Sequence, residues 1–115
     1  MTGQSNLWVP YKDGNTIGLR GSESGVILED QEYRSGARIT LESGAPGAPF
    51  AITCGAYGLF VHTRLFSRED EARGDFTEMK NGLRKMVDLS LDPATSEQID
   101  GILMEVASRF VDQYP

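Results

Sequence analysis

The stretch FVHTRLFSREDEARGDFTEM, residues 60–79, contains a change of hydrophobic rhythm at Ser67. Before Ser67, apolar residues alternate with polar ones in short runs separated by glycines, as is typical of β-strands. After it, they recur every three or four residues through two long segments, as on one face of an α-helix. We therefore predict an α+β domain spanning residues 1–115, with an antiparallel sheet over residues 7–66 followed by two amphipathic helices packed on one face.

The first helix is expected at about residues 68–90. Ser67 is a candidate N-cap, and the three acidic residues after Arg68 offset the positive end of the helix dipole. A rival start lies at Asp75, which forms a capping-box pattern with Glu78. The earlier start is favoured because it keeps the whole apolar stripe in phase. That stripe consists of Ala72, Phe76, Met79, Leu83 and Met86.

The second helix is expected at about residues 94–113. It begins either at Pro93, with Asp92 as its cap, or at Thr95, with Gln98 completing a capping box. Its broad apolar face consists of Ile99, Ile102, Leu103, Val106, Ala107, Phe110, Val111 and Tyr114. Two glycines, Gly82 and Gly101, lie inside the helices and indicate a close approach to a neighbouring element, because glycine disfavours a helix interior.

The sheet is expected to have about five or six strands in meander order. Pro10 has no N–H for a ladder, so residues 7–11 form an edge strand or no strand. A glycine-containing turn predicts a hairpin over residues 11–16. Further strands are expected at residues 16–20, 25–31, 37–43 and 49–66, the last range being a hairpin. The stretch 44–49, rich in Gly and Pro, predicts an irregular connection, with a hinge or lid as the alternative.

The register of the last hairpin decides which side chains share a face. A two-residue turn at Tyr57-Gly58 places Cys54 opposite Val61, with Ala56 opposite Leu59. The core face then consists of Phe50, Ile52, Cys54, Leu59, Val61 and Leu65, and the opposite face of Thr53, Tyr57, Phe60, His62, Arg64 and Phe66. A three-residue loop around Gly58 is the alternative and would place Cys54 beside His62.

Charge and composition exclude several function classes. The net charge is −6, and residues 67–115 carry eleven acidic and six basic side chains. This acidic helical half disfavours nucleic acid and membrane surfaces as partners. The single cysteine, Cys54, rules out an internal disulfide and fits a reducing compartment. Residues 1–15 lack the basic start and apolar stretch of a signal peptide, so a cytoplasmic location is expected.

No catalytic, cofactor or metal motif is present. Cys54 and His62 are too few for a zinc site, and the favoured register places them on opposite faces, which argues against a nucleophilic pair. Cys54 is instead expected to be a small buried side chain. The acidic run Glu29-Asp30-Gln31-Glu32 alternates faces and is typical of a strand end protected by charge. The sequence therefore favours a protein without catalytic activity, cofactor or metal.

The candidate site is the stripe of Phe60, His62, Arg64 and Phe66, with Thr53 and Tyr57 on the same face. If the helices cover the other face, two phenylalanines lie bare on the open side of the sheet. Three explanations remain: an N-terminal segment around Trp8 covers them, two chains form a homodimer there, or His62 and Arg64 hold a small anionic ligand.

Two function hypotheses follow from this stripe. The first is a cytosolic self-associating or partner-binding module, and the second is a small-molecule-binding protein or an enzyme without a recognisable signature. In either case the helix stripes predict that one core buries Phe76, Met79, Leu83, Ile102, Val106 and Phe110 together with Ile52 and Val61.

Overall fold

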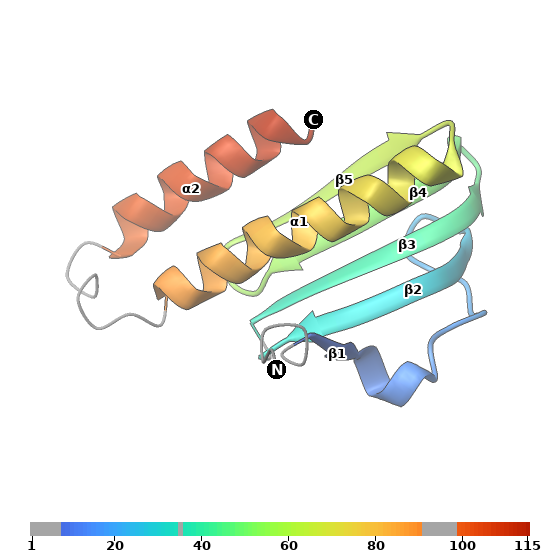
Figure 1. Ribbon diagram of the computed structural model, residues 1–115, viewed down its shortest axis with the longest axis horizontal. Helices are drawn as coiled ribbons and strands as arrows, with labels where there is room; N and C mark the ends of the chain where they lie inside the picture. The colour runs from blue at the N-terminus through green and yellow to red at the C-terminus, as the bar shows by residue number, and fades with distance from the viewer. Residues whose placement is uncertain (1–7, 35, 91–98) are drawn as a thin grey trace.

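The computed structural model describes residues 8–34, 36–90 and 99–115, and in the last range it describes side chains from residue 104 onward. Five antiparallel strands follow one another in meander order (Figure 1). Their bounds are β1 Trp8–Pro10, β2 Val26–Tyr33, β3 Ala37–Ala45, β4 Ala48–Ala56 and β5 Phe60–Phe66. The predicted α+β fold with an antiparallel meander sheet is confirmed.

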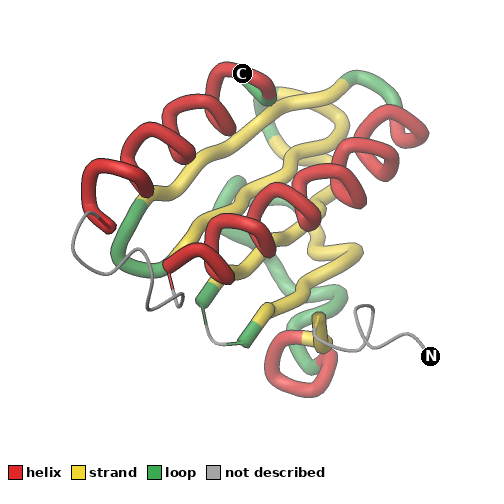
Figure 2. Tube along the Cα trace, turned by 60° about the vertical axis from the view of Figure 1, so that its left-hand side comes forward, coloured by secondary structure: helices red, strands yellow, loops and turns green. Residues whose placement is uncertain are grey.

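Two helices follow the sheet and lie on one of its faces (Figure 2). Helix α1, Glu69–Ser90, packs over the middle strands β3 and β4, and helix α2, Ile99–Gln113, lies beside α1 toward β5. The helix start near Ser67 is confirmed, and the rival start at Asp75 is wrong, because the backbone is helical from Glu69. The two expected starts of the second helix lie outside the described residues.

The core lies between the sheet and α1, and α2 completes it over β5. Phe76, Met79, Leu83 and Phe110 are buried together with Ile52, as expected from the helix stripes. Val106 is half-buried against the same core, whereas the side chain of Ile102 is outside the described residues. The prediction that Val61 belongs to this core is wrong, since it is 79% exposed.

The register of the β4–β5 hairpin is the three-residue alternative. Ala56 pairs with Phe60, Cys54 with His62 and Ile52 with Arg64. The chain reverses through a turn in which the Leu59 amide donates to the Ala56 carbonyl at 2.9 Å, and Gly58 takes the positive φ of 78° that a type II turn requires at this position. The predicted two-residue register is therefore wrong, and every β5 side chain lies on the face opposite to the one expected.

Three further expectations about the sheet are wrong. Residues 44–49 form a tight hairpin rather than an irregular connection, with Ala45 paired to Ala48. Residues Tyr11–Gly14 form a tight 3₁₀-type turn, in which Lys12 and Asp13 take left-handed φ angles of 49° and 57°, instead of a hairpin turn. Residues 16–20 form no strand, and only Arg20 makes an isolated bridge, to Val26. The edge strand limited by Pro10 is confirmed as β1.

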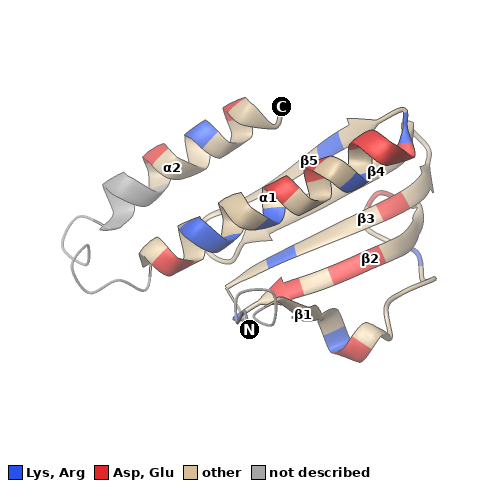
Figure 3. Cartoon of the chain, in the orientation of Figure 1, with Lys and Arg blue, Asp and Glu red and all other residues tan. Residues whose placement is uncertain are grey.

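Charged residues are unevenly distributed over this fold. Acidic positions gather along β2, and acidic and basic positions both occur along α1 (Figure 3). Within the described residues, no helix combines the length and the apolar character needed to cross a membrane.

Candidate functional site

The predicted stripe on β5 lies beneath the helices rather than on the open side of the sheet. The ring of Phe60 packs edge-on against Phe110 of α2, with 5.5 Å between ring centroids. His62 Nε2 donates to the carbonyl oxygen of Tyr114. Arg64 forms an ion pair with Asp75 of α1.

Phe66, the last residue of the stripe, is buried in the same core. The two helices therefore cover these residues. The sequence expectation of an open aromatic face at this stripe is wrong, and the reason is the one-residue difference in register.

Cys54 and His62 are cross-strand neighbours, contrary to the expectation that they lie on opposite faces. They do not form an activated pair. Burial raises the pKa of the Cys54 thiol to about 12, so the nucleophilic thiolate is suppressed near neutral pH. The expectation of a buried cysteine is confirmed, since Cys54 is 2% exposed.

The open face of the sheet carries a row of hydroxyl groups across its central strands. Thr40 pairs with Thr53, and Thr53 pairs with Thr63, so their side chains share this face. The Thr40 hydroxyl donates to the Thr53 carbonyl at 3.4 Å, and the Thr53 and Thr63 hydroxyls are 3.3 Å apart. A neighbouring row runs through Arg38, Gly55 and Val61.

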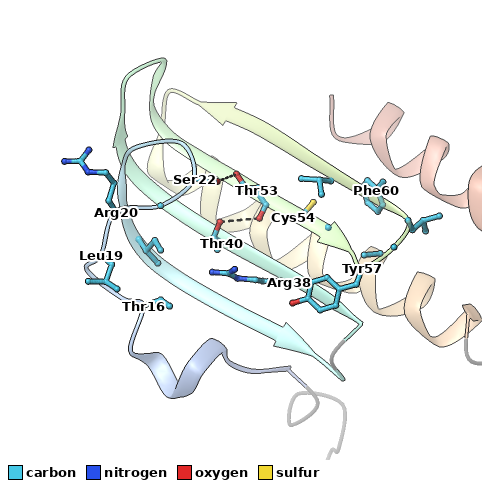
Figure 4. Close-up of a pocket in the computed structure, with 17 residues that line it drawn as sticks. Thr16, Leu19, Arg20, Ser22, Arg38, Thr40, Thr53, Cys54, Tyr57 and Phe60 are labelled. Atoms are coloured by element: carbon cyan, nitrogen blue, oxygen red, sulfur yellow. Dashed lines mark hydrogen bonds between the residues drawn. The ribbon is translucent and has the colours of Figure 1, made fainter.

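A pocket of about 700 Å³ lies over these rows (Figure 4). Its floor is the open face of β3 and β4, and one wall is the segment 16–22, which arches in front of the sheet while α1 lies behind it. Apolar side chains from Leu19, Ile27 and Val61 contribute to the walls. The hydroxyl-bearing lining residues are Thr16, Ser22, Thr40, Thr53 and Tyr57.

Arg38 is held in place at the floor of the pocket. Its Nε and Nη2 donate to the two carboxylate oxygens of Asp30 at 2.9 and 2.7 Å. Its guanidinium also stacks over the ring of Tyr11, 3.7 Å from the centroid. The hydrogen bond to Asp30 raises the pKa of Arg38, which stays positively charged. The acidic run on β2 is therefore not simply a charged strand end, because the Asp30 side chain is fully buried in this pair.

Two buried carboxylates hold the arching segment in position. Thr16 donates its hydroxyl to Asp30 at 2.8 Å. Farther along, the fully buried Glu42 accepts backbone N–H groups from Gly25 at 2.9 Å and from Glu23 at 3.2 Å. Asp30 on β2 therefore anchors one end of the segment 16–22, and Glu42 on β3 anchors the residues just beyond its other end.

Tyr57 closes one end of the pocket. Its hydroxyl donates to a carboxylate oxygen of Glu32 at 2.9 Å. Burial, followed by this hydrogen bond, raises the pKa of Tyr57 to about 12, so the phenol is neutral over the physiological range. The Tyr57 hydroxyl therefore serves as a hydrogen-bonding group and carries no charge.

Sequence reasoning located only part of this site. Of the six predicted site residues, Thr53, Tyr57 and Phe60 line the pocket, whereas His62, Arg64 and Phe66 do not. It missed Arg38, Thr40 and the segment 16–22. The alternation of Arg38, Thr40 and Glu42 with buried Ile39 and Leu41 was the available signal for the floor. No pattern within residues 16–22 predicted that this segment would arch over the sheet.

Among the side chains that the structure describes, no three His, Cys, Asp or Glu residues come together as a set able to hold a metal ion. Comparisons with protein-family models, with curated proteins and with solved structures find no match for this chain.

Proposed function

We propose that this protein binds a small molecule in the pocket on the open face of its sheet. The observation that carries this proposal is the pocket itself, whose volume of about 700 Å³ is typical of sites for small ligands. Apolar side chains wall it, and a few oriented polar groups lie at its floor. This combination gives binding energy through the walls and specificity through the floor.

The way the arch is held supports a ligand site rather than incidental packing. Burying a carboxylate costs several kcal/mol unless it is fully hydrogen-bonded. Among the described residues, the carboxylates of Asp30 and Glu42 are buried, and they anchor a surface segment across the open face of the sheet at Thr16 and just beyond Ser22. If this segment only had to cover the sheet, apolar side chains packed directly on the sheet would be enough, and no buried carboxylate would be needed.

We propose binding without catalysis. The described residues that line the pocket include no carboxylate and no imidazole, and the Cys54 thiol is protonated. General acid–base chemistry would need such a group within reach of the ligand. A cytoplasmic location, favoured by the single free cysteine, is part of the same proposal.

A matched pair of variants tests the site. Val61 and Leu65 lie on the same face of β5 and are both exposed, but only Val61 lines the pocket. Binding of N-phenyl-1-naphthylamine, a neutral probe that fluoresces in apolar surroundings, is expected to weaken about tenfold in Val61→Glu and to stay unchanged in Leu65→Glu. Equal effects of the two substitutions would contradict the proposal. Native mass spectrometry of the purified protein then tests for a retained ligand.

Self-association is a second candidate function, and one observation favours it. β5 is an edge strand, and its open face presents Val61 at 79% and Leu65 at 52% exposure. A homodimer or a partner protein that covers these side chains would remove an apolar edge from water. In that case both Val61→Glu and Leu65→Glu lower the mass measured by light scattering at high protein concentration. A wild-type chain that is monomeric there rules this function out.

A further inference from the structure

The charges around the pocket indicate what kind of ligand it accepts. Two of its described lining residues are cationic, Arg20 and Arg38. Arg20 donates its Nη1 to the Ser24 carbonyl at 2.9 Å, and its side chain points away from the pocket (Figure 4). Arg38 therefore supplies the one charged group that the described lining residues place at the floor.

The positive charge of Arg38 is already neutralised by a carboxylate of the protein. Arg38 uses Nε and Nη2 on Asp30, whose side chain is completely buried, so the two groups form a fixed neutral pair. Glu32, the cross-strand neighbour of Arg38, adds a second carboxylate close by, where Tyr57 donates to it. An anionic ligand head at the guanidinium would lie close to these two carboxylates, which flank the pocket without lining it. It would lose its hydration without gaining an unopposed positive charge.

The neutral Arg38–Asp30 pair and the nearby hydroxyl groups can still form hydrogen bonds with a ligand. Nη1 of Arg38 donates to no described residue, so it can donate to a ligand. The hydroxyls of Thr40 and Thr53 also line the floor. The Thr40 hydroxyl already donates to the Thr53 carbonyl, and the Thr53 hydroxyl shares a hydrogen bond with Thr63, so their remaining lone pairs can accept from a ligand. A carbonyl, amide or hydroxyl on the ligand satisfies such groups without bringing a charge into the pocket.

We infer that the pocket selects an uncharged, largely apolar molecule that presents a hydrogen-bond acceptor such as a carbonyl to Nη1 of Arg38, beside the threonine row. This inference rests on the proposed function and specifies its ligand class. It differs from the anionic ligand expected from the sequence, because the proposed anchors of that anion, His62 and Arg64, lie on the other face of the sheet and are engaged by the helices.

Two fluorescent probes of nearly the same shape test this inference. Dansylamide is neutral, and dansyl acid replaces its sulfonamide with a charged sulfonate. Dansylamide is expected to bind the wild-type protein at least about tenfold more tightly. The preference should persist at about 1 M salt, where a Debye length of about 3 Å screens the net negative charge of the chain. Dansyl acid binding as tightly as dansylamide would overturn the inference.

Asp30→Asn gives a second test, with circular dichroism to confirm the fold. Removing the carboxylate leaves the Arg38 charge unopposed, so affinity for dansyl acid is expected to rise about tenfold relative to dansylamide. An unchanged ratio in folded protein would overturn the inference.

Val61→Glu, with Leu65→Glu as its control, separates this failure from failure of the proposed function. If both probes bind equally and Val61→Glu weakens both, the ligand class is wrong and the pocket stands. If Val61→Glu leaves dansylamide binding unchanged, or neither probe binds, the proposed function fails and this inference fails with it.

Discussion

Gly82 on α1 faces the aromatic ring of Phe110 on α2, and a Cβ on Gly82 would lie 2.9 Å from Cε2 of that ring. The Phe110 ring is itself packed against Phe60 and Tyr114, with centroid separations of 5.5 and 5.0 Å. The ring therefore has little freedom to move aside. This close approach explains why a helix interior carries glycine, as the sequence indicated for Gly82, while the side-chain surroundings of Gly101 lie outside the described residues.

Gly82→Ala is expected to lower the free energy of unfolding by about 1 kcal/mol, because overpacking against Phe110 outweighs the gain in helix propensity. In a Phe110→Ala background the same substitution is expected to raise it, by up to about 1 kcal/mol. Urea denaturation of the four proteins in a double-mutant cycle measures both effects. The same effect in both backgrounds would show that the ring does not constrain Gly82.

Leu83→Ala is expected to cost about 2 to 5 kcal/mol, since Leu83 is fully buried between α1 and the sheet. Met104→Ala is the control on the other helix. It removes a side chain that is 68% exposed and should change stability by less than about 0.5 kcal/mol. Denaturant midpoints report both changes, and a Leu83→Ala midpoint equal to that of the wild type would contradict the assigned core.

Cys54 should react slowly with Ellman's reagent in the native protein and rapidly after unfolding, because the thiol is buried and protonated. Absorbance at matched pH in buffer and in denaturant measures both rates. Fast stoichiometric labelling of the folded protein would mean that the helices do not cover this part of β4.

The raised pKa of the Cys54 thiol should also make the free energy of unfolding fall at alkaline pH. Its pKa is about 12 in the folded state against 9.0 for an ordinary thiol. Below pH 9 the thiol is protonated in both states and contributes no pH dependence. Above pH 9 the unfolded chain ionises first, so stability falls with rising pH by up to about 1.4 kcal/mol per unit. Cys54→Ala should remove this part of the slope, measured by denaturation at several pH values.

Glu42→Gln should loosen the backbone that follows the arch, at Glu23 and Gly25. A glutamine amide offers one acceptor oxygen where the carboxylate accepts from both Gly25 and Glu23, so a loss of about 2 kcal/mol is expected. Hydrogen exchange should speed up at these two amides more than in β4. Glu23→Gln is the control, since its backbone N–H, and not its side chain, is the group that Glu42 binds. Unchanged exchange at Gly25 in Glu42→Gln would contradict the role of this carboxylate.

The candidate site was only partly predictable because its walls come from distant parts of the chain. The alternation of Arg38 and Thr40 with buried Ile39 and Leu41 is local, and it is the pattern of a strand with one apolar and one polar face. The arch depends on hydrogen bonds between residues far apart in sequence, such as Thr16 with Asp30 and Ser22 with Thr53. No periodicity within residues 16–22 predicts those hydrogen bonds, so the pocket could not be predicted from the sequence.

The α+β class, the meander order and the start of α1 could be predicted from the sequence, because they depend on local periodicity and short connections. The sequence could not determine the facing of β5. One face of that strand offers Phe60 and Phe66 and the other offers Val61 and Leu65, so both are apolar enough to enter a core. The choice between the two faces depends on which of them α1 and α2 cover. The core formed with α1 and α2 takes the phenylalanines, while Asp75 and the Tyr114 carbonyl satisfy the polar groups between them.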